Sequence, residues 1–145
     1  MQFTPEHESL RRTVAKFVET EINPHVDEWE AAEQFPSHEL FGKLGRLGLL
    51  GIKYDPAYGG LGMPNTVNTA LSEMFCSANM AFGMYPGLSH GAYNALHAYG
   101  TPAQKEKYLP HLVSGAWTGT MCLTEPQCGT DLGLLRSKAV PAGDG

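Results

Sequence analysis

The sequence lacks several features that mark whole classes of protein. Its cysteines, Cys76, Cys122 and Cys128, are odd in number and form no Cys-x-x-Cys pair, which argues against a zinc site or a disulfide framework and favours a reducing compartment. No apolar run approaches the ~18 residues that a membrane span needs, and no signal-type apolar segment stands at the N-terminus. We therefore expect a cytoplasmic protein with no metal and no membrane span.

Positive charge is also scarce. Ten Lys and Arg against 15 Asp and Glu give a formal net charge of −5, and the basic residues form no block, so nucleic acid is not expected as a partner. The glycine-rich stretch 52–62 lacks the order Gly-x-Gly-x-x-Gly, so we interpret it as a rigid connector and not as a phosphate loop. What remains is a globular composition, with 42% hydrophobic and 17% charged residues over 145 positions, long enough for one domain.

Helical periodicity dominates the first 110 residues. Thr4 and Pro5 can begin the first helix, and Pro24 is expected to end it. The expected helices cover residues 4–23, 25–32, 37–47, 64–77, 79–99 and 101–110. In the first four, the positions expected to be buried are Leu10, Val14, Phe17, Val18, Ile22, Val26, Trp29, Leu40, Phe41, Leu44, Leu47, Val67, Ala70, Leu71, Met74 and Phe75.

Two glycines, Gly42 and Gly45, lie inside the expected helix 37–47. Each weakens a helix by about 1 kcal/mol relative to Ala. Such a cost indicates either that another backbone comes close or that this helix is marginal, and the residues leave both explanations open.

The apolar segment 79–99 is expected to be a long helix that bends or breaks at Pro86. Small residues recur in it at every fourth position, namely Gly83, Gly87, Gly91 and Ala95. They either let a neighbouring helix pack tightly or line a slot for a flexible apolar ligand. His90 and His97 share a face of this helix, but no third metal ligand joins them, so we interpret both as structural.

After a capping box at Thr101 and a helix that Pro110 is expected to close, the periodicity changes. Beyond Gly115 the pattern alternates, and residues 117–124 and 135–140 are predicted to be strands on either side of a loop. We therefore place a helical domain at residues 1–114 and the start of a β domain at 115–145. Because two strands are only marginally stable alone, we expect the β domain to be truncated here.

The loop between these expected strands contains two Thr hydroxyls and a turn at Pro126 and Gly129. Such a loop can hold a flat or phosphorylated ligand through hydroxyl and backbone N–H groups. The same residues are also common in plain surface turns. The residues alone leave both interpretations open.

This loop resembles the signature of the acyl-CoA dehydrogenase family, which reads Ser/Thr-Glu-Pro, two variable positions, then Gly-Ser/Thr-Asp. Residues 123–131 read Leu-Thr-Glu-Pro-Gln-Cys-Gly-Thr-Asp, and the segments 17–29, 44–62 and 99–110 follow the family's order and spacing. The resemblance implies a mainly α fold, in which an N-terminal helical bundle is followed by the first strands of a β-barrel domain. It also implies that this chain lacks the rest of that barrel and a C-terminal four-helix domain.

The family oxidises an acyl-CoA to the trans-2-enoyl-CoA with FAD, and passes electrons to an electron-transfer flavoprotein. Its members are homodimers or homotetramers, and its catalytic glutamate lies in the C-terminal domain, so no catalytic residue is assigned here. By position, the resemblance implies that FAD is bound by Met121, Leu123, Thr124, Gly129 and Thr130. Thr130 would also touch CoA, and Leu88 would lie near the depth of the acyl pocket. Glu125 and Asp131 would hold the loop.

Three positions depart from the family's usual residues. Met121 replaces a common aromatic residue, Cys128 stands where Ala or Gly is usual, and Thr130 stands where Ser is commoner. Residues 80–141 are most similar to a branch that includes 3-(methylthio)propanoyl-CoA and fatty acyl-CoA dehydrogenases, so the acyl substrate stays open. The alternatives are a non-catalytic helical interaction module and a related flavoprotein of the acyl-CoA oxidase or nitroalkane oxidase type.

Overall fold

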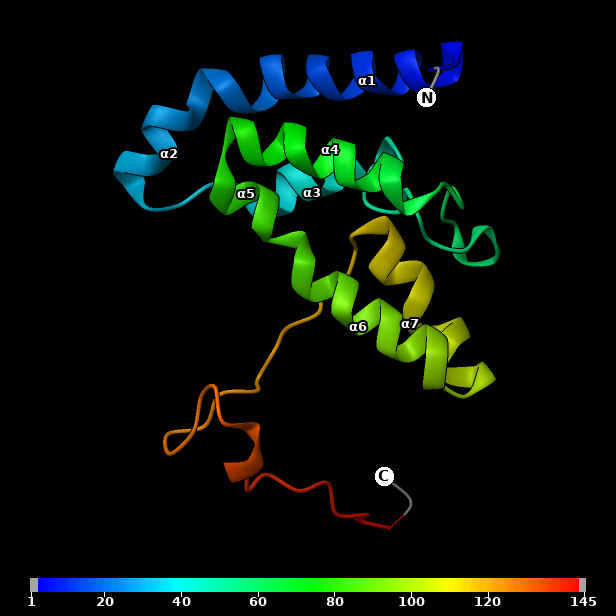
Figure 1. Ribbon diagram of the computed structural model, residues 1–145, viewed down its shortest axis with the longest axis vertical. Helices are drawn as coiled ribbons and strands as arrows, with labels where there is room; N and C mark the ends of the chain where they lie inside the picture. The colour runs from blue at the N-terminus through cyan, green and yellow to red at the C-terminus, as the bar shows by residue number, and fades with distance from the viewer. Residues whose placement is uncertain (1–2, 144–145) are drawn as a thin grey trace.

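The computed structural model describes residues 3–143, and the regular structure in this range is helical. The α-helices are α1 (Pro5–Phe17), α2 (Val26–Ala32), α3 (Ser37–Arg46), α4 (Asn65–Ala78), α5 (Met80–Met84), α6 (Pro86–Tyr99) and α7 (Pro102–Ser114). Helices α1 and α4 pack side by side, and α6 packs beside α7 (Figure 1). The mainly α fold predicted from the sequence is confirmed. No helix within the described residues is both long and apolar enough to cross a membrane.

The first helix does not end at Pro24. The chain passes from α1 through a π-helical turn (Val18–Ile22) and a 3₁₀ turn (Asn23–His25) directly into α2. Proline has no backbone N–H, and near the start of a new turn such a group would have no intrahelical acceptor, so Pro24 is accommodated there. At the other end, the Thr4 side chain accepts from the His7 N–H, and the Thr4 N–H donates to His7 Nδ1 at 3.1 Å. His7 thus closes the capping box.

The main hydrophobic core lies between α1, α3, α4 and α5, and most of the predicted buried positions form it. Its buried members include Val14, Phe17, Ile22, Leu40, Phe41, Leu44 and Leu71. The ring of Phe41 stacks on Phe82, with centroids 5.5 Å apart. Leu47 was predicted to be buried but is 48% exposed, because α3 ends at Arg46 and the helical spacing no longer holds beyond it. Ala70 is likewise exposed.

The two glycines of α3 have different surroundings. A Cβ atom on Gly45 would lie 2.0 Å from the carbonyl oxygen of Ser114, so α3 and the end of α7 approach each other through their backbones. A Cβ atom on Gly42 would meet only the Arg46 side chain, at 3.6 Å. Close backbone approach therefore explains Gly45 and does not explain Gly42.

The expected interruption at Pro86 is confirmed. Helix α5 ends at Met84, and Pro86 is the first residue of α6. A Cβ atom on Gly83 would lie 2.6 Å from Cys76 Sγ in α4, whereas Gly87 and Gly91 have nothing within 4 Å of that position. Tight helix packing thus accounts for Gly83, and the other two glycines border open space.

Helix α7 was predicted to close at Pro110 but continues to Ser114. The buried side chains of Leu109, Leu112 and Val113 anchor its last turn in a second apolar cluster. Burial of these side chains offsets the one backbone hydrogen bond that proline removes. Gly115, with φ of +75°, then ends the helix in the left-handed conformation that glycine adopts without strain.

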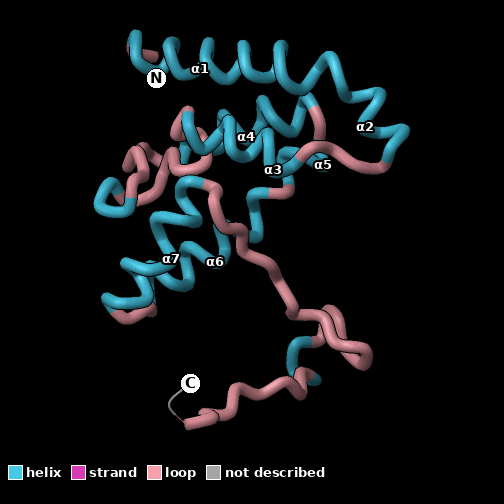
Figure 2. The backbone as a smooth tube through the Cα atoms, turned by 180° about the vertical axis from the view of Figure 1, so that it is seen from behind, coloured by secondary structure: helices cyan, strands magenta, loops and turns pink. Residues whose placement is uncertain are grey.

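Beyond α7 the chain leaves the helical body and runs as a loop (Figures 1 and 2). The strands predicted at 117–124 and 135–140 do not form within the described residues, where the only β-type pairing is an isolated bridge between Glu125 and Cys128. A strand needs a partner for its backbone N–H and C=O groups, and these two segments do not pair with each other. The division into domains at residues 114 and 115 stays a prediction.

Candidate functional site

Glu125 organises the loop that was singled out in the sequence. Its backbone exchanges two hydrogen bonds with Cys128, at 2.9 and 3.0 Å. Its carboxylate accepts the N–H groups of Arg136 at 3.0 Å and Ser137 at 2.8 Å. This carboxylate therefore joins the turn at 125–128 to a segment eleven residues further on, as expected for a residue that holds the loop.

Hydrogen bonds from the Ser137 side chain, and from the Arg136 and Ser137 backbone, lower the pKa of Glu125 to about 2. Glu125 is therefore ionised near neutral pH and is a poor proton acceptor there. Asp131 has a similar structural role: its Oδ1 accepts the Gly133 N–H at 3.1 Å and caps a short 3₁₀ turn (Leu132–Leu134).

The five predicted cofactor-binding residues are Met121, Leu123, Thr124, Gly129 and Thr130, and all are exposed on this loop. Met121 is 64% exposed and Leu123 40%. Within residues 3–143, neither Thr hydroxyl makes a hydrogen bond, and the N–H groups of Thr124, Gly129 and Thr130 also make none. The loop thus presents apolar side chains beside free donors, a set suited to one wall of a site for a planar, phosphorylated ligand.

The start of this segment is seated on α6, next to the predicted acyl-chain residue Leu88. The Gly119 N–H donates to Ser89 Oγ at 3.0 Å, and a Cβ atom on Gly119 would lie 2.6 Å from that of Ala92 and 3.1 Å from the Leu88 carbonyl oxygen. Leu88 itself is 43% exposed. Its role as a substrate contact stays a prediction, as do the roles of the loop residues.

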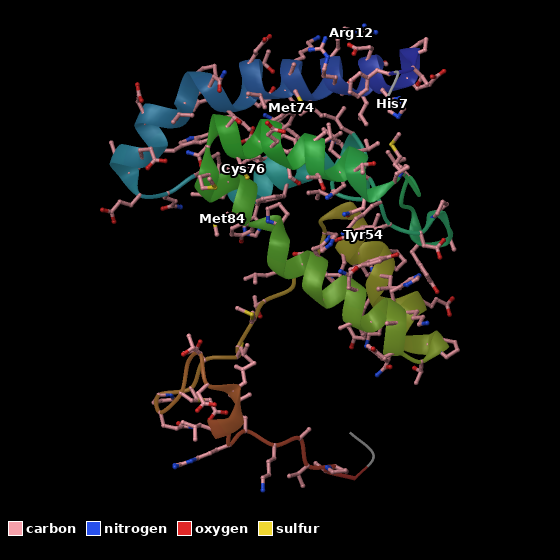
Figure 3. All side chains as sticks on the ribbon, viewed as in Figure 1. His7, Arg12, Tyr54, Met74, Cys76 and Met84 are labelled. Atoms are coloured by element: carbon pink, nitrogen blue, oxygen red, sulfur yellow. The ribbon has the colours of Figure 1, made fainter. Side chains whose placement is uncertain are left out.

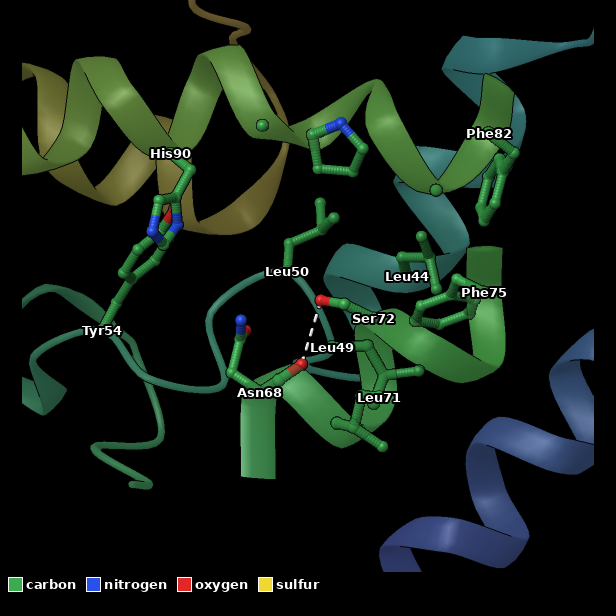
Figure 4. Close-up of a pocket in the computed structure, with 13 residues that line it drawn as sticks. Leu44, Leu49, Leu50, Tyr54, Asn68, Leu71, Ser72, Phe75, Phe82 and His90 are labelled. Carbon is green, nitrogen blue, oxygen red and sulfur yellow. Dashed lines mark hydrogen bonds between the residues drawn. The ribbon is translucent and has the colours of Figure 1, made fainter. Parts of the chain in front are cut away.

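A cavity of about 230 Å³ opens between α3, α4 and the helices on both sides of Pro86 (Figure 4). It is lined by Leu44, Leu49, Leu50, Tyr54, Asn68, Leu71, Ser72, Phe75, Phe82, Gly83, Pro86, Gly87 and His90. Two of the four small residues of the stripe, Gly83 and Gly87, border it. The stripe therefore borders this cavity at Gly83 and Gly87, while the binding of an apolar ligand there stays a prediction.

Tyr54 joins the connector 52–62 to this cavity. It lies against α6 (Figure 3), with its ring stacked on Tyr93 at 3.8 Å and its hydroxyl 2.8 Å from His90 Nδ1. Burial raises the pKa of Tyr54 and lowers the pKa of His90, so both are neutral near pH 7. On the same side, His97 Nε2 lies 3.3 Å from Asp55 Oδ2. Both histidines thus tie the connector to α6, in line with their structural interpretation.

Sequence reasoning missed three polar members of the cavity, Tyr54, Asn68 and Ser72. Asn68 and Ser72 lie four residues apart on α4, on the same face as the buried Leu71, so helical spacing could have placed them beside it. No periodic signal marks Tyr54, because it belongs to an irregular connector whose path depends on the packing of α6.

Residues 4–116 match the family described as acyl-CoA dehydrogenase, N-terminal domain. The chain belongs to this family. It is similar to the 3-methylmercaptopropionyl-CoA dehydrogenase of Ruegeria pomeroyi, with 46% identity over 99 residues, 68% of this chain and 17% of that protein. The mitochondrial isovaleryl-CoA dehydrogenase of Bos taurus is 36% identical over 141 residues, 96% of this chain and 33% of its own length. The crystal structure of a glutaryl-CoA dehydrogenase from Mycobacterium smegmatis in complex with FADH2 superposes with a TM-score of 0.86 and 27% identity, covering 97% of this chain and 36% of that one.

The chain therefore spans a third or less of the length of these two curated relatives. The acyl-CoA dehydrogenase family is one of oxidoreductases, and the helical fold of this chain is that of its N-terminal domain.

Proposed function

We propose that the protein containing this chain is an FAD-dependent dehydrogenase that oxidises an acyl-CoA to the trans-2-enoyl-CoA. The observation that carries the proposal is the loop 121–131 in a chain of this family. Glu125 fixes its turn through hydrogen bonds, while the residues that match the family's flavin contacts face outward with unused donors. An outward-facing, ordered loop of this kind is suited to bind a ligand that other parts of a protein enclose.

The chemistry of the loop residues suits them to form one wall of an FAD site. Met121 and Leu123 offer apolar surface to a flat ring, and Thr124 and Thr130 offer hydroxyl donors. At Gly129 a Cβ atom would meet only Thr124 Cγ2, at 3.9 Å, so a ligand can approach the backbone closely there. When bound, FAD supplies the acceptor for the hydride that leaves the β carbon of the substrate.

The remaining roles follow the same proposal. Leu88 and the cavity beside Gly87 contribute to binding of the acyl chain, and Thr130 also contacts the CoA moiety. No residue of this chain acts as the catalytic base, so the 145-residue chain is inactive alone and binds FAD weakly. The complete enzyme is a cytoplasmic homodimer or homotetramer that passes electrons to an electron-transfer flavoprotein.

An FAD titration followed by flavin fluorescence tests this function. The 145-residue chain is compared with any longer form that its source encodes, and we expect tight binding only by the longer form. In that form Thr124→Val should weaken FAD binding, because it removes a hydroxyl from the predicted contact, while Thr120→Val on the same segment should not. Tight FAD binding by the 145-residue chain would contradict the proposal that the loop 121–131 forms only one wall of the FAD site. Absence of binding by both forms would favour a helical interaction module instead.

A further inference from the structure

The cavity beside α6 has two chemically different halves. The apolar half is formed by Leu44, Leu49, Leu71, Phe75 and Phe82. The polar half is formed by Tyr54, Asn68, Ser72 and His90, and Figure 4 shows Asn68 and His90 reaching into the same space from α4 and α6. An acyl slot that bound only hydrocarbon would not need this polar half.

Two polar groups in this half have no partner within the described residues. The Tyr54 hydroxyl is hydrogen-bonded to His90 Nδ1 at 2.8 Å, so the second ring nitrogen, Nε2, is the one without a partner. The Ser72 hydroxyl donates to the Asn68 backbone carbonyl at 3.0 Å, while the Asn68 carboxamide makes no hydrogen bond within residues 3–143. An apolar chain end would displace water from both groups and replace none of its hydrogen bonds, which is unfavourable.

The charge of the cavity restricts the ligand further. No Lys, Arg, Asp or Glu lines it, and burial keeps His90 neutral near pH 7 by lowering its pKa. A carboxylate or ammonium group would therefore be partly desolvated without an opposite charge. A neutral group that can both donate and accept hydrogen bonds matches His90 and Asn68.

We infer that this cavity selects acyl chains whose far end carries a neutral hydrogen-bonding group, a hydroxyl or a carboxamide, with His90 and Asn68 as the specificity-determining residues. The inference rests on the proposed function in one respect: the ligand is taken to be an acyl chain. The volume is sufficient, since about 230 Å³ exceeds the cavity of about 150 Å³ that holds a benzene molecule in an engineered protein.

Binding of small probes to the chain tests the inference without FAD or any CoA ester, so its result does not depend on whether the proposed oxidation takes place. We would titrate the protein with hexan-1-ol, 1-chloropentane and hexanoate, which are similar in length. The amide shifts of Gly83 and Gly87 and the imidazole nitrogens of His90 report binding at this cavity by NMR. We expect hexan-1-ol to bind about tenfold more tightly than either of the others, the effect of one or two satisfied hydrogen bonds.

Two variants and one control complete the test. Asn68→Leu and His90→Phe should each lower the preference for hexan-1-ol over 1-chloropentane by about threefold or more, while 1-chloropentane still binds. Asn94→Leu, on an exposed position of α6, should leave the preference unchanged. His90→Phe also removes the hydrogen-bond partner of Tyr54, so Asn68→Leu keeps the test valid if His90→Phe does not fold. Equal affinities for the three probes, lack of binding by all of them, or an unchanged preference in Asn68→Leu would overturn the inference.

Discussion

Replacing Gly45 by alanine should destabilise the fold, although alanine is the better helix former. The new Cβ atom would lie 2.0 Å from the Ser114 carbonyl oxygen and 3.0 Å from its carbon. A Cβ atom essentially never comes closer than 3.0 Å to a heavy atom of a residue it is not bonded to, so α3 and α7 would have to separate by about 1 Å. The contacting atom belongs to the backbone and cannot rotate away.

The magnitude follows from two opposing contributions. Alanine in place of glycine inside a helix contributes about 1 kcal/mol of stability, and overpacking costs typically about 1–3 kcal/mol. Because a fixed backbone contact places this site at the upper end of that range, we expect a net loss of about 2 kcal/mol. Gly42→Ala is the matched control: its Cβ atom meets only Arg46 Nη1 at 3.6 Å, so the full gain of about 1 kcal/mol should appear.

Thermal and urea unfolding followed by circular dichroism at a helical wavelength measure both variants. For a chain of this size we expect Gly45→Ala to lower the melting temperature by about 4–8 °C and Gly42→Ala to raise it by about 2–4 °C. The reasoning would be refuted if both variants were stabilised equally, because the close approach of the α3 and α7 backbones would then not exist.

Two further predictions concern a buried cap and the loop. Asn79→Ala removes the acceptor of the Phe82 N–H (2.8 Å) and the donor to Glu30 (2.9 Å), and should cost about 1–2 kcal/mol in urea unfolding; an Asn79→Ala protein as stable as its parent would contradict this. The pKa of Glu125 is lowered from its usual 4.5 to about 2, so its hydrogen bonds are fully present above pH 4.5 and are lost as the pH falls through about 2. The Ser137 amide shift should therefore titrate with a midpoint near 2, and not at all in Glu125→Gln; a midpoint near 4.5 would show that the turn is not held by this carboxylate.

Much of the helical body could be predicted because its cause is local. Apolar residues at helical spacing require one buried stripe, and Val14, Leu40 and Phe41 are buried as that spacing indicates. The errors occur where tertiary contacts outweigh a local signal. Burial of Leu112 carries α7 past its proline. Segments 117–124 and 135–140 form no strands, because no neighbouring strand among the described residues pairs with their backbone groups.

The sequence by itself determined the helical fold, the family and the loop signature, since each depends on the order of residues along one segment. Only the tertiary structure decided which residues meet. Gly45 and Gly42 look alike in sequence, but one lies against the backbone of α7 and the other does not. Tyr54 reaches His90 across 36 positions of the chain, and the cavity they share exists because α3, α4, α5, α6 and a connector pack around it. Contacts of this kind depend on how elements pack in space, which periodicity along a single segment does not specify.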